Sequence, residues 1–107
     1  MEVNKETIGK SVYFIDRHIQ KTFVVEYGKI AAVVPKYCFR DKFSQDYARS
    51  ENILISTADK DGTLKSKVVN DASLVFETVQ DVLKYCNGAD IVFGYSAFKG
   101  DNNDSRI

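Results

Sequence analysis

Residue types that commonly perform catalysis or bind metals are sparse in this chain. His18 is the only histidine, and Cys38 and Cys86 are the only cysteines. Zinc sites usually draw their ligands from closely spaced Cys and His pairs, and the sequence has no such pair. A Cys–His nucleophile would need the fold to bring His18 to a distant thiol. We therefore expect His18 to be an exposed loop residue. No enzymatic activity, metal site or cofactor is predicted.

The stretch 59–63, Asp-Lys-Asp-Gly-Thr, has some features of a calcium-binding loop. An EF-hand loop with Gly62 at its sixth position would begin at Thr57 and end at Val68, so neither end would be acidic. The flanks are rich in β-branched residues, which favour strands over helices. Asp-Gly between two such runs is typical of a β-hairpin, and a hairpin turn is the interpretation we adopt. The six glycines are spread singly, so no phosphate-binding loop is present.

One segment mixes cations with aromatic rings between the expected strands. Such a mixture can stack on bases and pair with phosphates, or form a protein-binding hot spot. The alternative is that Tyr37 and Phe39 alternate as strand residues and pack in the core, while Arg40 and Lys42 are only solvated. The candidate binding residues are Lys36, Tyr37, Phe39, Arg40, Lys42, Phe43, Tyr47 and Arg49.

Short runs of β-branched and aromatic residues predict that strands dominate the fold. Both parities are apolar from Val12 onward in the first run, which indicates a strand covered on both faces. Gly28 suggests a turn or bulge between the second and third runs, and Pro35 should mark either the end of the third or a sheet edge. Residues 36–51 are expected to be a long loop, with a helical turn near 45–49 as one option. The strand runs are 8–15, 22–27, 30–34, 52–57, 63–69, 74–76 and 91–95.

Two further patterns predict which side chains of a strand and of a helix face the core. In the run 63–69, Lys65 and Lys67 share one parity, so we expect them to face water and Leu64 and Val68 to face the core. A helix should begin after the N-cap Thr78 and stop near Gly88, with an apolar face made by four residues. These four are Val79, Val82, Leu83 and Cys86. The predicted fold is mostly β (α+β), a small bent sheet or barrel of about six short strands with one C-terminal helix.

Length and charge narrow the class of protein. The 107 residues predict a single domain, 1–107, with flexible ends at about 1–6 and 100–107. Net charge is zero, whereas a generic nucleic-acid coat protein should be basic, so nucleic-acid binding is expected to be weak. There is no 18-residue apolar run and no secretory signal, so we expect a cytoplasmic protein with free, buried thiols and no membrane partner.

The segment 8–15, Ile-Gly-Lys-Ser-Val-Tyr-Phe-Ile, resembles the opening of small proteins from phages and mobile elements of Gram-positive bacteria. The segments 28–34 and 74–83 resemble later parts of the same group, although Val79-Gln80 interrupt its acidic pattern after the capping Thr78. The resemblance covers about a third of the chain. It implies a small Src-homology-three-like β-barrel and a mobile-element origin, and it assigns no catalytic residue.

The leading hypothesis is therefore a non-catalytic protein-interaction module, encoded by a phage or mobile element and acting on a host protein. The alternative is a small nucleic-acid-binding β-barrel. A sheet edge near Pro35 or Ile91 would also allow a homodimer.

Overall fold

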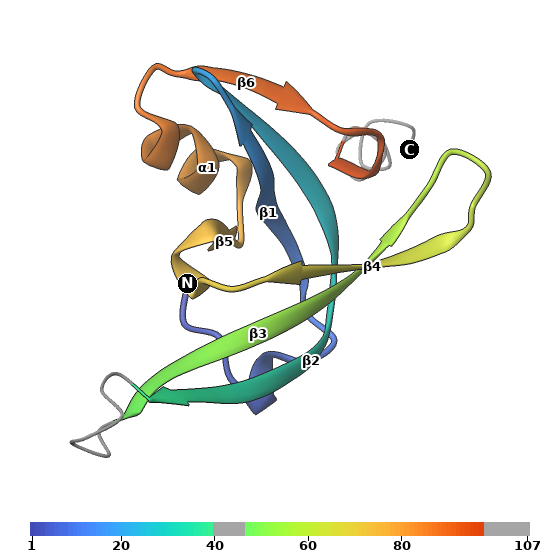
Figure 1. Cartoon of the computed structure of the whole chain (residues 1–107). Coiled ribbons are helices and arrows are strands. Elements are labelled where there is room, and N and C mark those ends of the chain that lie inside the picture. The colour runs from blue at the N-terminus through green and yellow to red at the C-terminus, as the bar shows by residue number, and fades with distance from the viewer. Residues whose placement is uncertain (40–46, 98–107) are drawn as a thin grey trace.

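A computed structural model describes the backbone of residues 1–39 and 47–97 and the side chains of residues 1–34 and 52–97. One sheet has the strand order β4-β3-β2-β1-β5, and β6 pairs with β2 (Figure 1). All pairs are antiparallel except β2–β6. The strands are β1 (Ser11–Ile19), β2 (Thr22–Phe39), β3 (Tyr47–Ala58), β4 (Leu64–Val69), β5 (Val75–Phe76) and β6 (Asp90–Phe93).

The helical elements are α1 (Val79–Cys86) and the 3-10 turns η1 (Lys5–Thr7) and η2 (Ala72–Leu74). The predicted class, mostly β with a helix near the C-terminus, is confirmed. Within the part of the chain that the structure describes, the end strands β4 and β5 do not pair with each other. The fold is therefore a bent open sheet and not a closed barrel.

β2 runs without interruption through the turn that was expected at Gly28. Gly28 is needed for close approach, because a Cβ there would lie 2.3 Å from the carbonyl oxygen of Ser56 in β3. The irregularity in the β2–β3 ladder falls later, between Ile30 and Ala32. The predicted break at 27–29 is therefore wrong. The tight spacing of β2 and β3 is the physical reason for a glycine at position 28.

The described part of the expected long loop, residues 36–39 and 47–51, is strand, and residues 40–46 lie outside the described residues. Pro35 pairs with Glu51, and the ladder continues to Phe39 and Tyr47. Since β1 and β6 pair with β2 only up to Lys29, the later part of β2 has a free edge in the described chain, where a proline can be accommodated. Pro35 therefore lies at a sheet edge, one of the two outcomes predicted for it, and does not end the strand. The helical turn expected near 45–49 is wrong at 47–49, and residues 45 and 46 lie outside the described residues.

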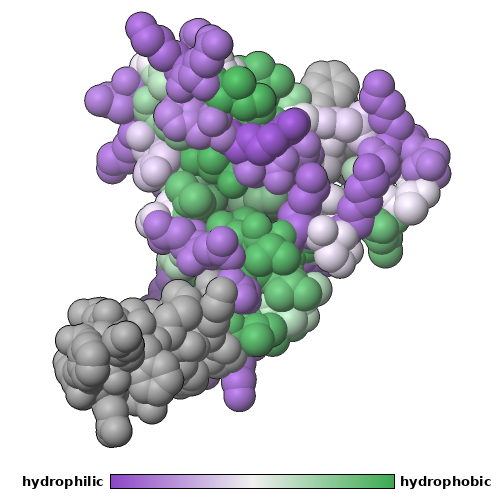
Figure 2. All heavy atoms as spheres, in the orientation of Figure 1, coloured by the Kyte–Doolittle hydropathy of each residue, from purple (hydrophilic) through white to green (hydrophobic). Residues whose placement is uncertain are grey.

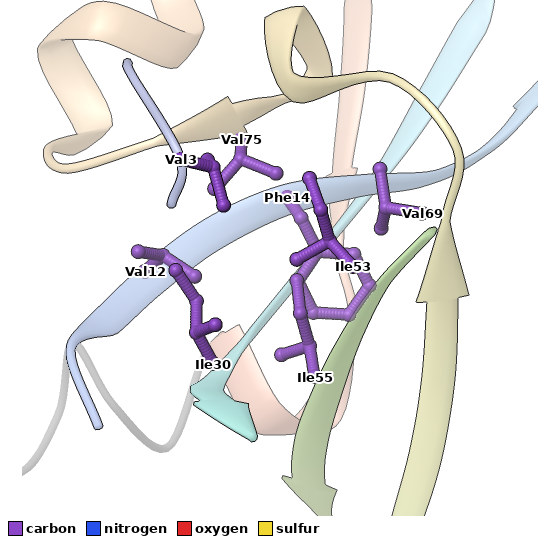
Figure 3. Packing of buried hydrophobic residues seen from close by; sticks show 8 residues of the cluster. All are labelled: Val3, Val12, Phe14, Ile30, Ile53, Ile55, Val69 and Val75. Carbon is purple, nitrogen blue, oxygen red and sulfur yellow. The ribbon is translucent and has the colours of Figure 1, made fainter. Parts of the chain in front are cut away.

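β1 separates two hydrophobic cores, which confirms the prediction that this strand is covered on both faces. Figure 3 shows the first core, into which Val12 and Phe14 point together with residues of β2, β3 and β4. Tyr13 and Ile15 pack in the second core, with α1. The first core consists of Val3, Val12, Phe14, Ile30, Ile53, Ile55, Val69 and Val75. The second consists of Tyr13, Ile15, Val25, Phe76, Val82, Cys86 and Ala97.

The N-terminal residues differ from the expectation of a flexible end. Val3 is buried in the first core, and Asn4 forms a capping box with Thr7 at η1. The backbone N–H of Glu6 donates to Asn4 Oδ1 at 2.8 Å. The other expected flexible end, 100–107, lies outside the described residues.

α1 forms where the sequence predicted a helix. Thr78 Oγ1 accepts a hydrogen bond from the backbone N–H of Asp81 at 3.2 Å, and the helix ends at Cys86, followed by the C-cap Asn87 with a left-handed φ of 47°. Val82 and Cys86 are buried and Val79 is half-buried, whereas Leu83 is exposed. The predicted apolar face was thus too wide, because Val79, Val82 and Cys86 pack in or against the second core and Leu83 does not.

Candidate functional site

β4 has its apolar side chains facing the opposite way from the expectation. Leu64 is 71% exposed and Val68 59% exposed, whereas Val69 is buried in the first core. Lys65 and Lys67 share the parity of Val69, and their side chains are 56% and 39% exposed. The prediction that Leu64 and Val68 face the core is therefore wrong.

The hairpin geometry and the burial of Val69 explain this orientation, and two ion pairs accompany it. The turn after β3 closes with a hydrogen bond from the Asp59 N–H to the Thr63 carbonyl at 2.8 Å, and this sets the β3–β4 register. Lys65 Nζ then lies 2.7 Å from Asp59 Oδ2, and Lys67 Nζ lies 3.6 Å from Asp16 Oδ1. The hydrogen bond from Lys65 lowers the pKa of the Asp59 carboxyl, and the same bond raises the pKa of Lys65. Burial of Val69 and the register set by the turn therefore fix the orientation of β4, and the ion pairs hold the partly exposed lysines in place.

The apolar side chains of β4 belong to a larger surface that crosses three strands, which we call the outer face. Strand alternation and the β2–β3–β4 registers place ten residues on it, after allowance for the bulge between Ile30 and Ala32. None of the ten is buried, whereas Ile53, Ile55 and Val69 of the opposite face are. The outer face consists of Lys29, Ala32, Val34, Asn52, Leu54, Ser56, Ala58, Leu64, Ser66 and Val68.

The composition of the outer face is unusual for a solvated surface. Lys29 is its only charged residue, and Val34 is 45% exposed beside the half-buried Leu54. Solvated sheet faces normally carry polar residues in alternation with a buried apolar face. Figure 2, which views one side of the molecule, shows hydrophobic surface over β3 and its neighbours and beside the β3–β4 turn, between hydrophilic residues. An extended, uncharged, partly apolar sheet surface can contact another protein.

Five of the eight candidate binding residues from the sequence lie in the parts of β2 and β3 farthest from the β3–β4 turn. Lys36, Tyr37 and Phe39 are in β2, and Tyr47 and Arg49 are in β3, with Tyr37 paired to Arg49 and Phe39 to Tyr47. The side chains of these five lie outside the described set, and Arg40, Lys42 and Phe43 lie outside the described residues altogether. Their role as a binding site stays a prediction.

A second surface feature lies around α1, where four aromatic rings make a row. His18, which is exposed in strand β1 and not in a loop, stacks on Phe23 with ring centroids 4.1 Å apart. The ring centroid of Tyr85 in α1 lies 6.0 Å from that of Phe23 and 5.3 Å from that of Phe76. Beside this row is a shallow hollow of about 360 Å³. It is lined by Met1, Phe76, Glu77, Asp81, Lys84 and Tyr85.

The polar groups of this hollow already have partners or oppose one another. Lys10 Nζ lies 2.5 Å from Glu77 Oε1, and Asp81 Oδ2 accepts a hydrogen bond from Thr78 Oγ1 at 2.9 Å. Lys84 adds a cation beside the two carboxylates. Within residues 1–34 and 52–97, no buried side-chain polar atom lacks a hydrogen-bond partner. The hollow therefore offers no convergent polar set for one ligand.

Side chains with catalytic potential have structural roles where they are described. Ser96 Oγ donates to the Glu26 carboxylate and accepts from the backbone N–H of Tyr27 at 2.9 Å, which ties the C-terminal segment to β2. Asp61 Oδ1 accepts from the N–H of Thr63 at 3.0 Å, and this lowers the pKa of the Asp61 carboxyl. Asp61 thus stabilises the hairpin turn that the sequence predicted at 59–63. Among the described side chains, no three His, Cys, Asp or Glu gather closely enough to hold a metal ion.

Comparison with known proteins identifies no relative. No protein-family model matches the chain, and neither a curated protein nor a solved structure matches it. In residues 1–39 and 47–97, no helix has the length and apolar character that crossing a membrane requires. The candidate site therefore depends on the geometry of the outer face alone.

Proposed function

We propose that this chain is a non-catalytic protein-interaction module whose contact surface is the outer face. The observation that carries the proposal is the exposure of Leu64 and Val68 on a strand that is fully paired to β3. Val34 extends the apolar surface two strands further. Removing such side chains from water contributes about 25 cal/mol per Å² of apolar area, so a partner that covers them gains affinity.

The tip of the β2–β3 hairpin supports the same function. Residues 36–39 and 47–51 continue β2 and β3, two of the three strands of the outer face, so one partner could contact the outer face and these residues together. Tyr and Arg, which occur at Tyr37, Tyr47 and Arg49, are enriched in binding hot spots. The resemblance to mobile-element proteins makes bacterial host proteins the partner class to screen first.

The test is a pull-down with two matched baits, the natural chain and the double variant Leu64→Ser/Val68→Ser. The double variant should lose the partner while its unfolding free energy stays within about 0.5 kcal/mol per site, because both side chains are exposed. Val69→Ala, the buried neighbour, is the control and should cost roughly 1–3 kcal/mol.

Three outcomes would contradict the proposal. A large loss of stability in Leu64→Ser/Val68→Ser would mean that these side chains are structural. Retention of the partner would place the contact surface elsewhere. Turnover of a substrate by the purified protein would show an enzyme. Arg40→Ala and Phe43→Ala test the tip separately, and unchanged binding in both would exclude these two tip residues from the contact.

A further inference from the structure

β4 has a free backbone edge in the described chain, since it pairs only with β3 and stands last in the strand order. In an antiparallel ladder, residues alternate between hydrogen-bonded and non-hydrogen-bonded pairs. The bond from Asp59 N–H to the Thr63 carbonyl marks one hydrogen-bonded pair. Alternation from there places Leu64, Ser66 and Val68 in non-hydrogen-bonded pairs, so that their N–H and C=O groups face the free edge.

Side-chain chemistry alternates along the same edge. Leu64, Ser66 and Val68 lie on the outer face and carry no charge. Lys65 and Lys67 lie on the other face, and the ion pairs that hold them leave both lysines partly exposed. Exposed ion pairs contribute little, so a carboxylate from a partner can compete for these ammonium groups.

The charges of Lys65 and Lys67 discriminate between two possible occupants of the β4 edge, a second copy of the chain and an acidic strand of another protein. If β4 of a second copy paired antiparallel about Ser66, Lys65 would stand opposite Lys67 on both sides of the axis. Like charges directly opposite each other destabilise a strand pair. Lysine on an edge strand is a known protection against self-pairing. An acidic partner strand reverses the sign of the same interaction.

We infer that β4 binds an extended partner segment that adds to the sheet as a further strand and alternates apolar and acidic residues. Its backbone bonds to Leu64, Ser66 and Val68, its apolar side chains extend the outer face, and its carboxylates lie opposite Lys65 and Lys67. This inference rests on the proposed function and specifies the partner and the manner of contact.

The experiment uses three synthetic peptides with a fluorescent label, titrated by anisotropy against the full chain. One contains Val-Glu-Val-Glu-Val, one Val-Lys-Val-Lys-Val, and one has the acidic composition with its alternation scrambled. The alternating acidic peptide should bind at least about fivefold more tightly than either of the others, because two cross-strand charge pairs change sign or lose register. Its affinity should fall as salt is raised.

Ser66 provides the matched variants. Ser66→Pro removes an N–H that faces the free edge and not β3, so the sheet should tolerate it while peptide affinity falls about tenfold or more. Ser66→Thr keeps the N–H and should bind as the natural chain does. Circular dichroism checks that both variants are folded. If Ser66→Pro unfolds, Lys65→Gln/Lys67→Gln replaces it and should abolish the preference for the acidic peptide.

Several results would overturn the inference. These are equal affinity for the acidic and basic peptides, absence of binding at millimolar peptide, or a folded Ser66→Pro that binds undiminished. A dimer of the natural chain that Ser66→Pro dissociates would make a second copy the occupant. A partner lost by Leu64→Ser/Val68→Ser but kept by Ser66→Pro would refute strand addition and leave the proposed function standing. A partner kept by both variants would refute both.

Discussion

At the scale of single residues, the structure assigns Gly28 a role in spacing the strands. Its φ lies outside the left-handed region, yet a Cβ would come within 2.9 Å of side-chain carbons of Ile55 and Thr57 as well as within 2.3 Å of a backbone oxygen. Gly62, by contrast, has a φ of 84° with open space around it. The two glycines are therefore required for different physical reasons.

Gly28→Ala should lower the free energy of unfolding by about 3 kcal/mol, since overpacking against backbone cannot be relieved by a side-chain rotation. Gly62→Ala should cost only about 1 kcal/mol, from backbone conformation alone. Urea denaturation followed by circular dichroism measures both values. Equal costs would show that β2 and β3 can separate to admit a methyl group.

Cys86 offers a second test at this scale. It is a free, buried thiol, as predicted, and burial raises its pKa. In a Cys38→Ser background, its reaction with a thiol reagent should be at least about a hundredfold slower in the folded than in the unfolded protein, because modification requires opening of the second core. Equal rates would show that the thiol is accessible.

The pH dependence of stability follows from the same shift. An ordinary thiol ionises near pH 9.0, whereas the folded Cys86 holds its proton to higher pH. Unfolding therefore releases a proton above about pH 9, and the unfolding free energy should fall as pH rises beyond that value. Cys86→Ser in the same background should lose this component, and an identical slope in both proteins would refute the assignment.

At the scale of elements, the stability of α1 comes from the hydrogen bonds of its first turn and from packing, because the helix is short. Eight residues are too few for an isolated helix to be stable in water, so capping and packing must hold it. Thr78 Oγ1 makes two hydrogen bonds with Asp81: it accepts one from the backbone N–H and donates one to the carboxylate. Val82 and Cys86 then anchor the helix on the second core.

Thr78→Ala should lower the unfolding free energy by about 1 kcal/mol, and Thr78→Ser should restore most of it because serine keeps the capping oxygen. Thermal denaturation of the two variants under the same conditions checks the ranking. If Thr78→Ser is as unstable as Thr78→Ala, the threonine methyl group and not the cap is the stabilising part.

At the scale of the whole molecule, zero net charge limits what the chain can bind through long-range electrostatics. If it binds single-stranded nucleic acid at all, the few cations of segment 36–49 should give a weak complex with a salt slope of about −2 to −4. Anisotropy of a labelled oligonucleotide at several salt concentrations measures this slope. Tight binding at physiological salt would favour the nucleic-acid alternative. If Arg40→Ala/Lys42→Ala left that binding unchanged, the nucleic acid would bind to a different surface of the protein.

Local patterns in the sequence determined several elements directly. Asp-Gly at 61–62 between β-branched runs predicted the β3–β4 hairpin, and Thr78 with Gly88 bounded α1. Apolar residues at both parities of 12–15 predicted a strand between two covered faces, which the two cores confirm. These features depend on residues within a few positions of each other, so the sequence contains their causes.

Only the tertiary structure decided the course of β2 and the orientation of β4. Gly28 and Pro35 commonly interrupt strands, but here a close β3 strand requires the glycine and a free edge accommodates the proline. Lys65 and Lys67 alternate with Leu64 and Val68, a pattern that allows either face to be buried. Val69 enters the first core, whose other members all lie outside β4. Asp59 and Asp16, which pair with Lys65 and Lys67, also lie outside β4. The outer face was thus not predictable from alternation, because the groups that orient β4 lie mostly outside it.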